Sequence, residues 1–253
     1  MRSRLISMVF LCFMTASSRA YLPPAGPVFD RTAFGFTLSI DRCYREIRYD
    51  GADSSLNAVF NDRQKHEDPM MGYSVGLSLR KQRSLHWILE AGLRYTIRGY
   101  QYRSADKTFG PAIDTNYVTV TNVTQALDEI LIRHQYRYVE VPLRLHYQFT
   151  ENRLRYHVAA GIALGLPLGV TVSTRYKFSN GEREVKRNQL PDQDLKISIT
   201  PILSAGMEFY YSHRLRFYLD PTYQFALNDA AATTIRERLN SAGLQFGVIY
   251  RYR

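Results

Sequence analysis

Charged residues stand singly inside segments that are otherwise apolar, and they are the first candidates for chemistry. The acidic members are Asp41, Glu90, Glu140, Glu208 and Asp220, and the basic members are Arg80, Arg94, Arg98, Arg144, Arg216 and Arg251. Paired carboxylates could act as general acid and base, and a row of mixed charges could line a polar path for a small solute. Because buried charges persist only when they are paired, the nearly balanced numbers favour a structural network of salt bridges. We assign to this network Glu90, Arg94, Arg98, Glu140, Arg144, Glu208, Arg216 and Asp220.

The histidines and cysteines offer little further chemistry. The histidines are His66, His86, His134, His146, His157 and His213. They form no HExxH motif, no close pair and no Ser–His–Asp arrangement that spacing identifies. His146 and His157 share the face of the charged residues, and we expect both to be hydrogen-bonded filler. Cys43 is the only cysteine after residue 20, which excludes an intrachain disulfide in the exported chain and leaves one thiol for any metal site. We therefore predict no metal centre, no cofactor and no enzymatic activity.

The charged residues lie on segments in which apolar residues occupy every second position. In residues 136–149, for example, Leu143 and Leu145 alternate with Arg144 and His146. This period of two predicts β-strands. The segments span residues 34–48, 71–80, 86–102, 136–149, 154–172, 195–211, 215–227 and 242–252. The fourth and fifth segments form a hairpin whose arms exceed the roughly 9 to 11 residues that a tilted strand needs to cross a bilayer.

The joins between these segments alternate between short and long. Short joins follow the second, fourth and sixth segments, at residues 81–85, 150–153 and 212–214. Long polar joins follow the others, at residues 49–69, 103–135, 175–194 and 228–241. This pattern is typical of an outer-membrane barrel with short periplasmic turns and long extracellular loops.

Two of the long joins carry signals of regular structure. Residues 122–133 place apolar residues at near-helical spacing, which leaves open a short helix on the rim or an extension of the following strand. Asn180-Gly181 is a hairpin-turn signal, so the fifth and sixth strands are expected to extend beyond the bilayer.

Alternation alone does not separate a membrane barrel from a soluble barrel with an apolar ligand cavity. Two features favour the membrane. The charged face carries the glycines that a narrow, crowded lumen requires, namely Gly76, Gly92, Gly161, Gly165, Gly206 and Gly247. The apolar face gathers aromatic residues near the short joins, as a lipid interface requires, among them Phe34, Phe36, Trp87, Phe149, Tyr156, Tyr211, Phe217 and Tyr250. We predict an all-β fold, an eight-stranded antiparallel up-and-down transmembrane β-barrel.

The N-terminal residues predict export. Residues 1–20 combine Arg2 and Arg4 with an apolar core and small residues up to Ala20, as in a cleaved signal peptide. Residues 21–32 would form a periplasmic lead-in, and residues 33–253 the barrel. The formal net charge of +10 could suggest nucleic acid, but the basic residues form no block and no basic helix, so we expect no nucleic-acid partner.

Two motifs resemble features of known proteins. The chain ending resembles the signal that the outer-membrane assembly machinery reads, through Gln245, Gly247, Tyr250 and Tyr252. The hairpin resembles the hallmark of the PorT-like outer-membrane β-barrel family, through Tyr138-Val139-Glu140-Val141-Pro142-Leu143 and the strand with Gly161. Pro142 also has a physical interpretation, because a residue without an N–H is tolerated in a strand ladder only at a bulge or an unpaired position.

The family resemblance implies a location and a kind of role. It implies a small barrel in a Gram-negative outer membrane, in contact with the lipid of that membrane. It further implies a role accessory to protein secretion, in company with other envelope or secretion proteins. A structural or interaction role is favoured by the residues themselves, because no nucleophile stands out and the lumen residues are bulky and paired. Two alternatives stay open: an outer-membrane enzyme acting on lipid or peptide, and a narrow pore for small solutes.

Overall fold

A computed structural model describes residues 31–48, 66–104, 127–149, 153–178, 180–190, 195–229 and 236–251. The predicted signal peptide at 1–20, the lead-in up to residue 30, and Tyr252 of the C-terminal motif lie outside these residues. Of the described segments, none is a helix with the length and apolarity needed to cross a bilayer.

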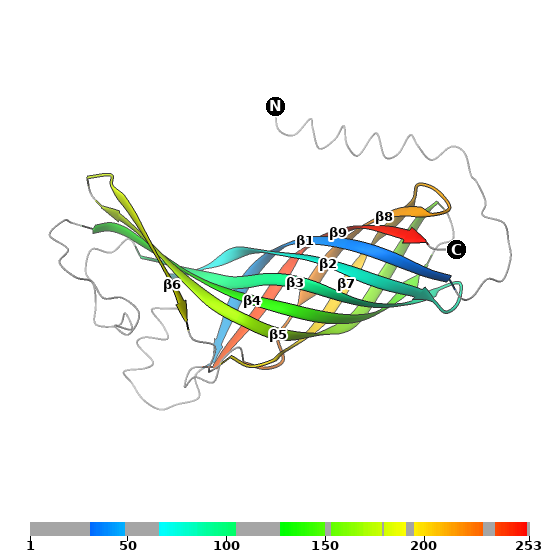
Figure 1. Cartoon of the computed structure of the whole chain (residues 1–253), viewed down its shortest axis with the longest axis horizontal. Coiled ribbons are helices and arrows are strands. Elements are labelled where there is room, and N and C mark those ends of the chain that lie inside the picture. The colour runs from blue at the N-terminus through cyan, green and yellow to red at the C-terminus, as the bar shows by residue number, and fades with distance from the viewer. Residues whose placement is uncertain are drawn as a thin grey trace.

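The described residues form nine strands joined in antiparallel pairs. These are β1 (Arg31–Arg48), β2 (Glu67–Gln82), β3 (Trp87–Ser104), β4 (Leu127–Gln148), β5 (Leu154–Phe178), β6 (Arg183–Leu190), β7 (Ser198–Tyr210), β8 (Leu215–Gln224) and β9 (Arg236–Arg251). Eight of them close into a ring in the order β1-β2-β3-β4-β5-β7-β8-β9, because β9 pairs with β1 and β5 pairs with both β4 and β7. The sixth strand, β6, pairs only with β5 (Figure 1). The predicted eight-stranded antiparallel barrel is therefore confirmed.

In the second long join, residues 103–135, the described part is a strand and not a helix. Residues 127–133 belong to β4, and they pair with β3 as far as Ser104 opposite Ile130. A helix over these residues is wrong, because the extended β3 and β5 offer a hydrogen-bonding partner on each side. Residues 122–126 lie outside the described part of the chain.

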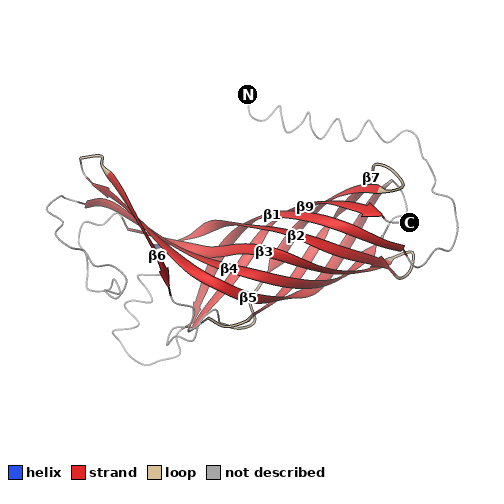
Figure 2. Cartoon of the chain, viewed as in Figure 1, coloured by secondary structure: helices blue, strands red, loops and turns tan. Residues whose placement is uncertain are grey.

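The fifth predicted strand extends beyond the ring as expected, to Phe178 in β5. The extension of the sixth predicted strand is wrong, because β7 begins only at Ser198, opposite Gly165 of β5. The join between these two strands contains instead a strand that we did not predict, β6. The Gly181 N–H donates to the Phe178 carbonyl at 2.9 Å, and Gly181 has a φ of 87°, which closes the turn predicted at Asn180-Gly181. After this turn β6 runs back along residues Val170 to Lys177 of β5. Strand β9 likewise begins at Arg236, earlier than predicted, because it pairs with β1 up to Arg48. Figure 2 shows the ends of β4, β5 and β6 projecting beyond the ring.

The two faces of the ring differ in chemistry. Large apolar side chains point outward, and Leu77 on β2 is 68% exposed. On the same strand Ser74 and Arg80 are buried inside. An apolar exterior and a polar, filled interior are the inverse of a soluble protein and suit a wall that faces lipid.

The seam between β1 and β9 gives a direct test of ring closure. In a Cys43→Ala background, we expect Leu38→Cys and Phe246→Cys to form a disulfide on mild oxidation, since the two positions are register partners and both face outward. Such partners lie within the Cα separation of about 4.4 to 6.8 Å that a disulfide needs. The measurement is the mobility of the denatured protein on a non-reducing gel. The control pairs Leu38→Cys with Val248→Cys, which is one pair out of register. Equal cross-linking of both pairs would contradict the closed seam.

Candidate functional site in the barrel lumen

The lumen holds a balanced set of buried charges. Among the described residues that lie inside the ring, the buried arginines are Arg80, Arg94, Arg98, Arg144 and Arg216, and the buried carboxylates are Asp41, Glu90, Glu140, Glu208 and Asp220. All residues assigned to the charge network from the sequence are in this set. With five charges of each sign the formal charge of the set is zero, as a region of low dielectric constant requires.

One tier of the network lies near the short turns and centres on Glu90 of β3. Arg80 of β2 donates to Glu90 Oε2 at 2.5 Å, and Arg144 of β4 donates through Nε to Glu90 Oε1 at 3.0 Å. Arg80 also spans the lumen, with Nη1 3.4 Å from Glu208 of β7. Glu208 in turn accepts from Arg216 of β8 at 2.9 Å. The tier therefore ties together strands on opposite sides of the ring.

A second tier lies further from the turns and centres on Glu140 of β4. Arg94 donates to Glu140 Oε2 at 2.5 Å, and Arg98 Nη2 lies 3.0 Å from Glu140 Oε1. Both arginines also donate to the Gln224 side-chain carbonyl of β8, at 2.7 and 2.5 Å respectively. Glu140 is fully buried, so these guanidiniums replace the water that its carboxylate has lost.

Asp220 departs from the expected pairing of carboxylates with guanidiniums. The side chain that approaches its carboxylate is a histidine, with His157 Nε2 3.0 Å from Asp220 Oδ1. His146 Nε2 lies 3.2 Å from Glu90 Oε2, and the two imidazole rings are 5.3 Å apart. A histidine beside a carboxylate is the arrangement of a general base, but both histidines are 2% exposed.

Glycines make room for these side chains. A Cβ on Gly206 of β7 would lie 2.1 Å from Asp220 Oδ1, so the absence of a side chain lets His157 and Asp220 meet across β7. A Cβ on Gly161 would lie 2.8 Å from Arg144 Cγ. The same close approach to a large lumen side chain recurs at Gly76, Gly243 and Gly247. Each of these five glycines therefore leaves room for one particular neighbouring side chain.

The sequence analysis missed a third tier, toward the long loops, that is aromatic. Its buried apolar cluster consists of Tyr100, Tyr136, Tyr138, Val170, Val172 and Leu239. The Arg45 guanidinium lies 3.8 Å from the centre of the Tyr100 ring and pairs with Glu67 of β2 and Glu237 of β9. The sequence did contain an indication of this tier. Tyr136 and Tyr138 lie an even number of residues from Glu140 on the same strand, so their side chains must face inward with it.

The hairpin motif that resembles the PorT-like family lies in the middle of the lumen wall. Tyr138 and Glu140 point inward, and Gly161 lies opposite Arg144. The ladder between β3 and β4 runs to Ala91 opposite Leu143 and resumes at Arg94 opposite Glu140, so it leaves Pro142 outside. This interruption is the unpaired position that a residue without an N–H requires.

The C-terminal motif lies on β9. Gln245 and Gly247 face the lumen, and Tyr250 faces outward. Gln245 accepts a hydrogen bond from Arg144 at 3.0 Å and donates one to the Tyr218 hydroxyl at 3.0 Å, so it also belongs to the charge network.

Residues 33–232 match the family described as outer membrane protein beta-barrel domain, which covers most of the chain. The chain belongs to this family. The membrane around the barrel is therefore the outer membrane of a Gram-negative cell. In this family of barrels the short turns face the periplasm and the longer loops face outside.

The outer-membrane barrel has a periplasmic aromatic ring. The exposed aromatic side chains at the short-turn end are Phe34, Phe36, Trp87, Phe149, Tyr156, Tyr211, Phe217 and Tyr250. Trp87 packs edge-on against Tyr147 with ring centres 4.9 Å apart. The amphipathic members, Trp87 and the tyrosines, suit the depth at which the lipid headgroups of the inner leaflet begin.

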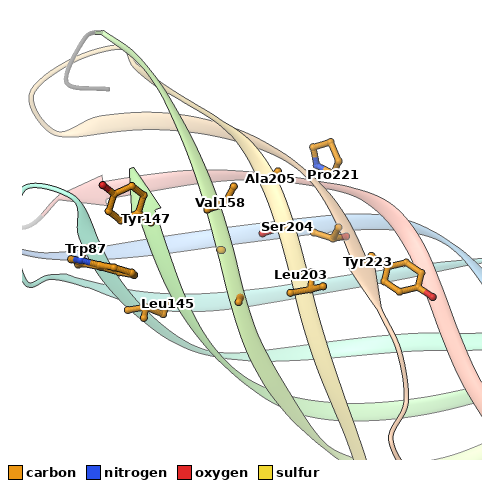
Figure 3. Close-up of a pocket in the computed structure, with 12 residues that line it drawn as sticks. Trp87, Leu145, Tyr147, Val158, Leu203, Ser204, Ala205, Pro221 and Tyr223 are labelled. Carbon is orange, nitrogen blue, oxygen red and sulfur yellow. The ribbon is translucent and has the colours of Figure 1, made fainter. Parts of the chain in front are cut away.

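A shallow groove crosses the outer wall beside this ring. Trp87 and Tyr147 form one side, Leu203 and Tyr223 form the other, and Val158 lies between them (Figure 3). The small side chains Ala160 and Ala205 line its floor. The groove opens on the lipid-facing surface, because its large lining side chains Trp87, Val158, Leu203 and Tyr223 are exposed on the apolar outer face.

Several solved structures are similar to this outer-membrane barrel. Neisserial surface protein A (NspA) is 11% identical, with a TM-score of 0.43, covering 90% of this chain and 100% of that one. OprG from Pseudomonas aeruginosa is 11% identical, with a TM-score of 0.44, covering 90% and 98%. The attachment invasion locus protein Ail of Yersinia pestis, in complex with the heparin analogue sucrose octasulfate, is 13% identical, with a TM-score of 0.37, covering 88% and 99%. No curated protein sequence matches the chain. At these identities and TM-scores the likeness carries no argument about function.

Removing Glu140 tests the charge network. We expect Glu140→Ala to lower the free energy of unfolding by about 3 to 5 kcal/mol, because Arg94 and Arg98 are left buried without their carboxylate. Glu184→Ala is the matched control, since Glu184 on β6 pairs with Lys186 at 3.5 Å at a half-exposed site. An exposed pair is worth about 0 to 1 kcal/mol. The measurement is urea unfolding of the barrel in lipid vesicles. Equal stability of the two variants would mean that Glu140 is solvated.

Proposed function

We propose that this protein is a closed outer-membrane barrel with a structural or interaction role, accessory to protein secretion. The observation that carries the proposal is the occupied lumen, which holds two ionic tiers and one aromatic tier in succession. An eight-stranded ring is just wide enough for side chains to fill. Because side chains fill the lumen, we place the site of action on the exterior of the barrel and not in its interior.

The extension beyond the ring is the surface that supports an interaction role. Strands β3, β4 and β5 continue above the ring, and β6 adds a fourth strand whose side chains from Arg183 to Gln189 are all exposed. Among the described strands β6 has a neighbour only in β5, so one of its edges presents backbone groups for pairing. Such an edge accepts a strand from another chain.

The finer assignments rest on sequence. The link to secretion comes from the PorT-like hairpin, and recognition by the assembly machinery comes from the β9 motif. Cleavage of the signal peptide after residue 20 stays a prediction of the sequence. We also propose that the protein is not an enzyme, since His146 and His157, the histidines placed next to carboxylates in the lumen, are sealed by the tiers around them.

Conductance tests the closed lumen. We expect the purified protein to produce no discrete conductance steps in planar lipid bilayers, because the tiers around Glu90, Glu140 and Tyr136 occupy the path in turn. A porin inserted into the same bilayers is the positive control. Regular conductance steps from the folded protein would replace the proposal by the narrow-pore alternative.

Photo-crosslinking tests the interaction role. A photoreactive residue in place of Asn188, exposed on β6, is expected to capture envelope proteins in whole cells as discrete bands of higher mass. The same residue in place of Leu164, on the lipid-facing wall, is the matched control and should give no protein adducts. Protein adducts at neither position, or equally at both, would count against an interaction role for the extension.

A further inference from the structure

The chemistry of the two faces reverses where the strands leave the ring. Along β4 the outward residues Val141 and Val139 are apolar, whereas the next outward residues, Arg137, Gln135 and Arg133, are polar or cationic. On the inward face the charged Glu140 gives way to Tyr138 and Tyr136. Since the parity of β4 is continuous through its pairing with β3, the reversal is a change of surroundings and not of register.

The outward face of the extension carries a concentration of cations. Register with β4 places on this one face Arg103 of β3, Arg133 and Arg137 of β4, Arg175 and Lys177 of β5, and Arg183 and Arg187 of β6. Two of these cations have carboxylate partners, since Arg103 lies 3.2 Å from Glu129 and Lys177 lies 3.1 Å from Asp128. No ion pair joins the other five arginines to a carboxylate among the described residues. We call these five the arginine patch: Arg133, Arg137, Arg175, Arg183 and Arg187.

The arginine patch lies directly above the lipid-facing wall. Arg137 is two residues beyond Val139, which is about 7 Å along a strand, and Arg133 is about 13 Å further. The Arg137 Nε is buried and has no hydrogen-bond partner. A cationic surface at this height faces the headgroups of the outer leaflet, where guanidiniums bind phosphate oxygens in a bidentate manner.

We propose that the arginine patch binds the phosphate groups of the anionic glycolipid of the outer leaflet, lipopolysaccharide. Continuity with the apolar wall favours this occupant over an acidic protein, because the acyl chains of the same molecule would lie against Leu164, Leu166 and Leu168 of β5 while its phosphates meet Arg137 and Arg175. The proposal rests on the orientation of the barrel and stands whether or not the extension also captures a protein.

The test measures lipid binding by the full-length protein in detergent. The probes are bis-phosphorylated lipid A and the same lipid A after removal of its phosphates, and native mass spectrometry counts the bound molecules. The variant is Arg175→Gln with Arg187→Gln, both exposed on neighbouring strands. We expect binding of phosphorylated lipid A to weaken about fivefold for each arginine removed, or about 25-fold for both. Arg175→Lys with Arg187→Lys keeps both charges but loses the bidentate geometry, so its binding should lie between that of the wild type and that of the glutamine variant.

Two controls separate the patch from charge in general. Lys186→Gln removes a cation from β6 on the opposite face, and Arg83→Gln with Arg214→Gln removes two exposed arginines at the periplasmic end. Both controls should bind phosphorylated lipid A as the wild type does. The proposal is overturned if the controls lose as much binding as the variant, or if dephosphorylated lipid A binds as tightly. It is also overturned if the variant loses binding of an acidic extended peptide and keeps lipid A, which would assign the patch to strand addition at β6.

Discussion

Neutralisation of charge inside the barrel wall is the constraint on which the rest of the structure depends. A carboxylate enclosed by protein and lipid loses its water, and only a guanidinium or another polar partner recovers that free energy. Arg94 and Arg98 do this for Glu140, and Arg80 and Arg144 do it for Glu90. The register of β3 and β4 follows from these pairs. A slip of β4 by one residue against β3 would turn Glu140 and Arg144 toward lipid and the leucines beside Arg144 toward the lumen.

The same constraint accounts for the distribution of small residues. A ring of eight strands encloses little space, and several of the large side chains in it stand beside a residue without a side chain. Gly161 supplies this space for Arg144, and Gly206 supplies it for the approach of His157 to Asp220. Outside, where lipid adapts to any shape, the wall carries large apolar side chains instead. Glycine inside and leucine outside are thus two consequences of one narrow lumen.

The net charge of the chain is distributed unevenly along the barrel axis. The buried lumen set contributes no net charge, so the formal excess of +10 belongs to the rest of the chain. Part of this excess is the arginine patch. It lies on the outward face of the strands, which is apolar along the ring and cationic in the extension. In the role that we propose, recognition takes place on the outside of this outer-membrane barrel, at the boundary between membrane and surroundings, and the barrel holds the extension there.

Period two in the sequence was sufficient to predict the eight ring strands, the alternation of their faces and the inward direction of Glu140, Arg144 and His146. Parity decides these features because each step along a strand reverses the side chain. Parity also implied Tyr136 and Tyr138 inside, although the sequence analysis did not use it there. The partner of Asp220, the reach of Arg80 to Glu208 and the strand β6 appeared only in the tertiary structure. Those features depend on the tilt of the strands and on which residues stand at the same height across the lumen, and ring closure sets both.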